Sequence, residues 1–294
     1  MTVTRFAFKL GEGENYIDLA KAMSLVQRTM VRQKQLFTVL GGQLVDNPNT
    51  QSKIKISTAP NFWYIRAAIN RCFKAWKDQR SRTLGNAELD GVKNATAKYA
   101  DFKMSLTGSG STLTPVYTGG ASIVPFNTTG EWEFASVTDE LGNERHFKIV
   151  GPHTSNYYSA TKGWLVTRAL PDAENEPDMM DTVDPSGAGS ADGILDYKQD
   201  FINIMNETAD GQPERLTLLY EDNDNAPFGV RDIYGNVDQS TNLQLQSLVY
   251  VNANNPSHMI AGFKALCGLI KVDVDENATD PILFLDVLNT PEVF

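Results

Sequence analysis

Cysteine and histidine are scarce in this sequence, with two and three copies among 294 residues. Cys72 and Cys267 lie in apolar sequence surroundings, which predicts two buried free thiols and a reducing compartment during folding and assembly. None of the three histidines has a partner at metal-ligand spacing, and no His-Glu-x-x-His motif occurs. The sequence therefore predicts no metal centre built on histidine or cysteine.

Long apolar runs are also missing. No stretch approaches the ~20 residues that a bilayer-spanning helix needs. Residues 1–10 alternate apolar and polar side chains and lack the apolar segment of a secretory signal. The hydrophobic fraction of 41% and the charged fraction of 21% are those of an ordinary globular protein. Chains of this length bury roughly three quarters of their unfolded surface, so a sizeable core is expected.

Catalytic motifs are absent from the sequence as well. There is no Gly-x-Ser-x-Gly elbow, and the glycine-rich run 108–111 lacks the Gly-Lys-Ser/Thr of a P-loop. Residues 11–16 begin like a dinucleotide fingerprint, but Tyr16 stands in place of the third glycine. A glycosidase pair of carboxylates cannot be chosen among 36 acidic residues. We therefore expect that the chain is not an enzyme and needs no cofactor.

The net charge of −10 is divided unevenly along the chain. Residues 1–110 hold 17 basic and 8 acidic residues, whereas residues 111–294 hold 9 basic and 28 acidic residues. A chain divided in this way tends to present two electrostatically different surfaces, one of which can face a polyanion. An ordinary scatter of solvated charges is the alternative.

Two amphipathic helices are predicted in the first third of the chain. Asn15 can cap a helix from Tyr16 to about Lys34, and Asn61 can cap a second helix that follows Pro60. Each helix has apolar residues at three- and four-residue steps, which gives one buried stripe. The stripes consist of Tyr16, Leu19, Ala20, Met23, Val26 and Met30 in the first helix and Phe62, Ile65, Ile69, Cys72, Phe73 and Trp76 in the second.

After Leu84 the sequence changes to short β-like runs separated by Gly, Pro, Asn and Asp, which favours a sandwich or barrel over βαβ units. The predicted strands cover residues 3–9, 36–45, 53–58, 99–106, 113–117, 132–137, 146–150, 163–169, 215–220, 243–251, 259–274 and 281–287. This number fits one eight-stranded jelly roll with additions, whereas two rolls need about sixteen strands. We therefore predict a mainly β fold, a single jelly-roll β-sandwich with two added helices and long surface loops. It forms one domain, 1–294, with a basic helix-containing part (1–85) and a β-rich acidic part (86–294).

Two long polar segments, 170–197 and 221–242, interrupt the β-rich part. Insertions of this length and polarity usually lie on the surface, where variable or functional contacts are made. Two acidic runs, 222–225 and 273–277, supply the hard oxygen ligands that Ca²⁺ accepts, but neither continues into a twelve-residue calcium loop. Two interpretations of these runs stay open: solvated acidic turns, and sites for structural Ca²⁺ between subunits.

Basic residues gather around the two predicted helices, interleaved with aromatic residues. Lys and Arg neutralise phosphates without reading sequence, and exposed rings stack on unpaired bases. The helical spacing of Phe73 and Trp76 favours core positions for these two rings. For the basic residues two interpretations stay open: contact with phosphates, and simple solvation at the surface. The candidate nucleic-acid-binding residues are Arg28, Arg32, Lys34, Arg66, Lys74, Lys77, Arg80 and Arg82.

Two segments carry a family resemblance: 16–24 (Tyr-Ile-Asp-Leu-Ala-Lys-Ala-Met-Ser) and 57–68 (Ser-Thr-Ala-Pro-Asn-Phe-Trp-Tyr-Ile-Arg-Ala-Ala). They resemble the N-terminal part of capsid proteins of small icosahedral single-stranded DNA viruses, of the environmental circular DNA virus or tailless phage type. The resemblance covers about the first 110 residues. It implies a viral jelly-roll subunit, a major capsid protein that assembles with copies of itself into an icosahedral shell enclosing a DNA genome. The protein would then reside in the virion, after assembly inside the host cell.

One departure from the family pattern concerns the genome. Many such capsid proteins begin with an arginine-rich arm, whereas residues 1–10 hold only Arg5 and Lys9. Non-specific contact with packaged DNA is therefore expected from the folded basic helices, or from another protein. The acidic loops are candidates for contact with a host receptor.

Two other functions stay open. A viral receptor-binding or spike protein is also β-rich and loop-decorated, and it would form a small oligomer. A hydrolase built on a β-sandwich would use carboxylates that the sequence does not single out.

Overall fold

The computed structural model describes residues 2–46, 52–89, 100–119, 122–127, 130–138, 143–166, 243–279 and 281–294. The prediction of a mainly β protein is confirmed, and the two larger sheets are antiparallel. The predicted strand 215–220 and the long segments 170–197 and 221–242 lie outside the described residues.

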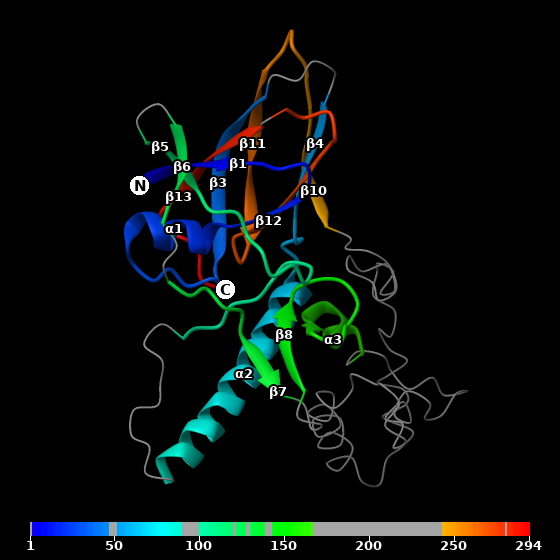
Figure 1. Ribbon diagram of the computed structural model, residues 1–294. Helices are drawn as coiled ribbons and strands as arrows, with labels where there is room; N and C mark the ends of the chain where they lie inside the picture. Colours follow the sequence, from blue (N-terminus) through cyan, green and yellow to red (C-terminus); the bar gives the residue numbers. More distant parts are fainter. Residues whose placement is uncertain are drawn as a thin grey trace, which may run out of the picture.

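Ten strands form two sheets that enclose one core between them (Figure 1). Sheet A has the order β11 (Ser257–Leu266), β3 (Leu36–Val45), β13 (Ile282–Leu288), β1 (Val3–Lys9), β5 (Val116–Gly119) and β6 (Ser122–Pro125). Sheet B has the order β10 (Gln244–Val251), β4 (Ser52–Thr58), β12 (Leu269–Val274) and β2 (Gly13–Asp18).

Eight of these strands pair in a nested order. Strand β1 pairs with β13, β2 with β12, β3 with β11 and β4 with β10. Two further antiparallel pairs, β13 with β3 and β12 with β4, join them into the two sheets. The nesting is that of a long antiparallel ribbon that folds back on itself.

Alternation of apolar and polar residues gives each strand one buried face. In β1, Phe6 and Phe8 are buried, whereas Arg5 lies on the solvent side and forms a 2.7 Å ion pair with its cross-strand neighbour Asp286. The largest fully buried side chains of the sandwich core come from both sheets and from the first helix: Phe6, Phe8, Ile17, Leu19, Met23, Phe37, Leu44, Ile54 and Ile56.

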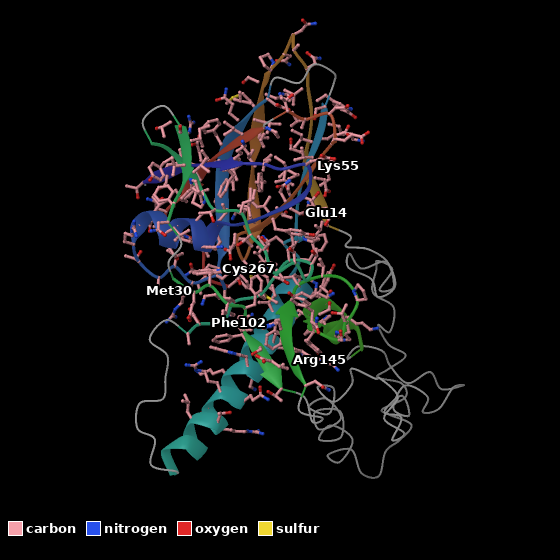
Figure 2. All side chains as sticks on the ribbon, in the orientation of Figure 1. Glu14, Met30, Lys55, Phe102, Arg145 and Cys267 are labelled. Atoms are coloured by element: carbon pink, nitrogen blue, oxygen red, sulfur yellow. The ribbon has the colours of Figure 1, made fainter. Side chains whose placement is uncertain are left out.

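A second core lies against one end of the sandwich. It contains α2 (Trp63–Leu89), α3 (Ala160–Val166) and a three-stranded sheet of β7 (Ser136–Thr138), β8 (Glu144–Lys148) and β9 (Tyr157–Ser159). Figure 2 shows Phe102 in this lower part and Cys267 between the two parts. Both cysteines are buried free thiols, as predicted from their surroundings.

The first helix is shorter than predicted. Residues 13–18 form strand β2, and α1 (Leu19–Gln27) is capped by Asp18, whose carboxylate accepts hydrogen bonds from the backbone N–H groups of Ala20 and Lys21. Asn15, the predicted cap, instead bonds the backbone of Gly11. The helix ends at Arg28, which adopts a left-handed φ of 56°. The prediction that the helix continues to Lys34 is therefore wrong.

Other predicted elements also differ. Residues 163–166 belong to α3 and not to a strand, because the Ser159 hydroxyl at the start of this segment accepts a hydrogen bond from the N–H of Lys162 and supports a helical turn. In the predicted strand 99–106, the described residues make one isolated bridge, from Ser105 to Lys148, and form no strand. Asn61 does not cap α2, since its side-chain oxygen is buried without a hydrogen-bond partner.

Candidate functional site

Five of the eight candidate nucleic-acid-binding residues lie on α2: Arg66, Lys74, Lys77, Arg80 and Arg82. The side chains of Lys74, Lys77 and Arg82 are exposed. Arg66 and Arg80 are partly buried, with the Nε of Arg66 enclosed and the Arg80 guanidinium 5.5 Å from the centre of the Trp76 ring. Residues 63–85 contain a single acidic residue, so the exposed side of this helix is positively charged.

The two sides of α2 have different environments. Ile65, Ile69 and Cys72 are buried in the second core, and the rings of Phe73 and Trp76 pack on Phe102 with centroid distances of 5.5 and 5.7 Å. Between residues 77 and 85 no side chain is buried. Figure 1 shows this end of the helix running away from the sandwich. The first half of the helix is therefore anchored in the second core, whereas the second half extends away from the sandwich.

The other three candidates lie on the non-helical segment after α1. The Nζ of Lys34 is 4.8 Å from the centre of the Phe73 ring and donates a 3.2 Å hydrogen bond to the carbonyl oxygen of Phe294. Arg32 is exposed and lies 3.5 Å from the carboxylate of Asp101. The structure thus brings Lys34 to α2, whereas Arg32 is partly neutralised and Arg28 sits at the end of α1.

A further cation at this surface was missed from the sequence. The Arg71 guanidinium lies 4.4 Å from the centre of the Trp164 ring of α3, and Trp164 meets Trp63 edge-on at 5.9 Å. Trp63 is 56% exposed. The available signal was the position of Arg71 within the same run of cations, five residues after Arg66. Trp164 thus lies between Arg71 and the exposed Trp63, and a cation near an exposed indole matches the chemistry that binds unpaired nucleotides.

Asp18 is the most deeply enclosed charged group in the described part of the sandwich. Its Oδ1 accepts from the N–H groups of Ala20 and Lys21, and its Oδ2 accepts from Gln33 Nε2 at 3.0 Å and Trp132 Nε1 at 2.9 Å. Burial raises the pKa of Asp18 to about 6, against the opposing effect of these hydrogen bonds. Both carboxylate oxygens accept hydrogen bonds, and the residue is inaccessible to solvent. Asp18 therefore links the start of α1 to the segments that carry Gln33 and Trp132, and it has no oxygen available to a substrate.

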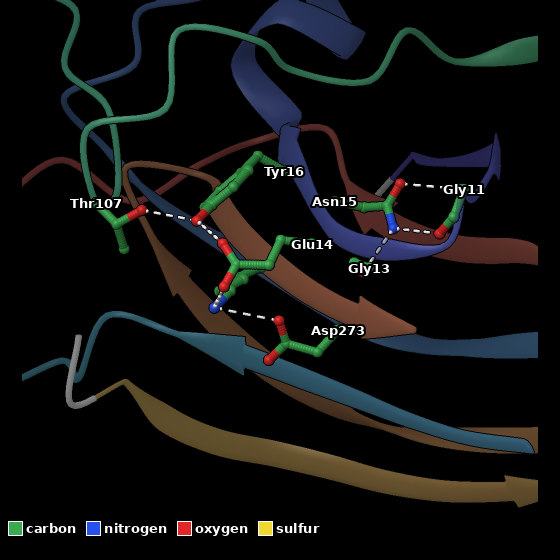
Figure 3. A network of polar contacts seen from close by, with 8 residues as sticks. Gly11, Gly13, Glu14, Asn15, Tyr16, Thr107 and Asp273 are labelled. Carbon is green, nitrogen blue, oxygen red and sulfur yellow. Dashed lines mark hydrogen bonds and ion pairs between the residues drawn. The ribbon is translucent and has the colours of Figure 1, made fainter. Parts of the chain in front are cut away.

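A second polar cluster lies on the outer face of sheet B (Figure 3). Lys271 of β12 bonds Glu14 at 2.8 Å and Asp273 at 3.1 Å, and Tyr16 donates to Glu14 at 2.8 Å. Burial alone would lower the pKa of Lys271, but the bonds to the two carboxylates outweigh it and raise the pKa. The hydrogen bond from Lys271 lowers the pKa of Glu14. Glu14 and Asp273 are directly opposite each other in the β2–β12 ladder, and Lys271, opposite Tyr16, bonds both carboxylates and offsets the repulsion between them.

The acidic run 273–277 does not gather ligands for a cation. Asp273 is paired with Lys271, and Asp275 accepts a hydrogen bond from the N–H of Glu276 within the same turn. Within the described ranges, no group of three or more His, Cys, Asp or Glu side chains could hold a metal ion. The other acidic run, 222–225, lies outside these ranges. None of the helices in the described part of the chain is long and apolar enough to cross a membrane.

Comparisons with protein-family models, with curated proteins and with solved structures found no match for this chain.

Proposed function

We propose that this chain is the shell-forming subunit of a small DNA virus and that its two facing sheets form a single jelly roll. The nested strand pairing supports this fold most directly. Counted along the chain, the first of the eight strands pairs with the eighth, the second with the seventh, the third with the sixth and the fourth with the fifth. Jelly rolls are double sheets of eight strands, and viral capsid and lectin domains use them.

The positions of the additional elements agree with a decorated roll. The helices and the third sheet lie at two connections between strands of the framework. Helix α1 lies between β2 and β3, and α2, the third sheet and α3 lie between β4 and β10. Insertions at strand connections leave the eight-stranded framework unbroken. This arrangement supports the proposal that the helices are additions to a roll.

Assembly rather than catalysis is the proposed activity. Many modest contacts between identical subunits close a symmetric shell, and the basic side of α2 faces the packaged polyanion. Arg5 is paired with Asp286 within sheet A, so its charge is already neutralised. We assign neutralisation of DNA phosphates to Lys74, Lys77 and Arg82, the exposed cations of α2.

Electron microscopy of the purified protein tests the proposal. We expect closed particles of uniform diameter, and nuclease-protected DNA inside those recovered from cells that contain the genome. Small closed oligomers in place of shells would favour a receptor-binding protein. A monomer at every protein concentration and salt concentration would contradict the shell proposal.

A further inference from the structure

We propose that β10 (Gln244–Val251) docks, edge to edge and antiparallel, on β10 of a second copy of this chain. This inference rests on the proposed function, since a shell requires contacts between copies. It goes further by assigning one of those contacts to a particular strand and a two-fold symmetry.

Strand β10 is at the edge of sheet B. It pairs with β4 on one side, and among the described residues no strand pairs with its other side. The outward backbone N–H and C=O groups of an edge strand are a template for another strand. A strand of eight residues is long enough to form a continuous ladder with a partner.

The outer face of β10 is apolar. Val249 and Val251 point into the sandwich core and are buried, whereas Leu245, Leu248 and Tyr250 are 53%, 40% and 46% exposed. In the cross-strand register, Leu248 lies beside Lys55 and Tyr250 beside Lys53 of β4. The apolar side chains are therefore confined to the edge strand, next to a charged sheet surface. Apolar groups gathered in this way at a sheet edge are typical of an interaction site.

Charge distinguishes this edge from the other described edges of the two main sheets. Residues 243–257 contain no charged residue. Strand β11 carries Lys264, β2 carries Glu14 and Asp18, and β6 is four residues long and ends at Pro125. Lysine, inward-pointing charge, proline and shortness are the devices that protect sheet edges from pairing. Among these edges, β10 alone lacks all four. A β-bulge is a further protecting device, and the one in β10 lies between Leu245 and Ser247, so that residues 247–251 form a regular edge.

The neutrality of β10 indicates a second copy as its occupant. Two-fold antiparallel pairing brings a strand opposite its own sequence, so a charge near the centre of the strand would lie near the same charge on its partner. The whole chain carries a net charge of −10, which opposes the approach of two copies through most surfaces. A neutral apolar strand removes this repulsion locally. A strongly charged partner would find no complementary charge on this strand.

The test is sedimentation velocity of the intact chain over a range of concentrations, with paired variants. Leu248→Lys/Tyr250→Lys places two charges on the edge of β10. Tyr117→Lys/Ile123→Lys makes the same change at two side chains of similar exposure, 47% and 48%, on β5 and β6. We expect the β10 variant to weaken self-association at least 10-fold, and the control variant to associate like the wild type.

Four results would overturn the inference. If the wild type and the β10 variant associate equally, the inference is wrong, and the shell proposal stands as long as shells still form. Equal weakening by both variants would show a general effect of charge. A β10 variant with lower thermal stability but unchanged association would indicate that the chain covers its own edge. A monomeric wild type would overturn both proposals. If the lysines disturb folding, Leu248→Thr/Tyr250→Thr removes the apolar groups with a residue that suits strands, and the same 10-fold weakening is expected.

Discussion

Gly268 lies where the chain passes sharply from sheet A to sheet B. The corner is a turn closed by a 3.1 Å hydrogen bond from the N–H of Gly268 to the oxygen of Ala265, and both Cys267 and Gly268 have left-handed φ values, 57° and 69°. A Cβ on Gly268 would lie 3.0 Å from the Phe37 ring and 3.1 Å from the Cβ of Leu19. Glycine satisfies both the backbone conformation and the space at this position.

Gly268→Ala should therefore lower the free energy of unfolding by about 1–3 kcal/mol. Gly85→Ala is the matched control, because Gly85 lies within α2 and a Cβ there would meet nothing within 4 Å. The control should raise stability by roughly 0.5–1 kcal/mol. Urea unfolding of both variants measures the difference. Equal effects of the two substitutions would contradict the tight corner.

Asp18 should make stability depend on pH. Burial raises its folded-state pKa to about 6, above the value of about 3.9 for an exposed Asp in the unfolded chain. The folded state therefore holds the proton more tightly. This contribution to stability is complete below about pH 4 and is lost as the pH rises through 6, with a total change of roughly 3 kcal/mol.

The measurement is the free energy of unfolding of the wild type and of Asp18→Asn between pH 4 and pH 8. Glu14 and Asp286, whose pKa values are lowered by Lys271 and Arg5, contribute with the opposite sign in both proteins. Subtracting the two curves cancels these groups. We expect the difference to change between pH 4 and pH 6.5. A difference that is flat with pH would refute the raised pKa.

At the scale of the element, the two halves of α2 differ: the first half packs against the second core, and the second half leaves it. Its first half is held by apolar packing on Phe102 and by the stack of Arg71 on Trp164. Beyond Lys77 its side chains leave the core, although Gln79 still exchanges two hydrogen bonds with the backbone of Thr138 in β7. The anchored half fixes the direction in which the exposed cations point. Changes to those cations should therefore leave the fold intact.

Lys74→Glu/Lys77→Glu should weaken binding of single-stranded DNA and lower its dependence on salt. Each lost phosphate contact reduces the slope of log K against log salt concentration by roughly 0.7, so the double variant should lose about 1.4. The control, Lys9→Glu/Lys55→Glu, makes the same change of charge at exposed strand residues. Fluorescence anisotropy at several salt concentrations measures both slopes. An equal reduction in the two variants would assign the effect to net charge and not to α2.

At the scale of the whole molecule, the framework depends on contacts between distant parts of the chain. The first and last strands pair over seven residues, and the N–H of Asn289 bonds the oxygen of Thr2. The two cores meet near the corner at Cys267. The basic helix extends from the second core, away from the sandwich (Figure 1). The sandwich can therefore present the edge of β10 to a neighbour while α2 projects elsewhere.

The sequence by itself determined several strands, in particular residues 3–9 and 36–45, whose predicted bounds match β1 and β3. It also predicted the basic helix after Pro60 in outline, and both buried thiols. These features are visible in a sequence because alternation, helical spacing and local composition act over a few residues.

Only the tertiary structure decided the rest. Residues 16–18 were predicted to begin a helix, but residues 13–18 form β2 because β12 supplies a complete antiparallel partner. Residues 160–166 form a helix that packs on α2. The apolar outer face of β10 and the enclosure of Asp18 depend on which strands and side chains become neighbours. Strand pairing and burial are made by residues far apart in the chain, and local patterns do not encode which partners will meet.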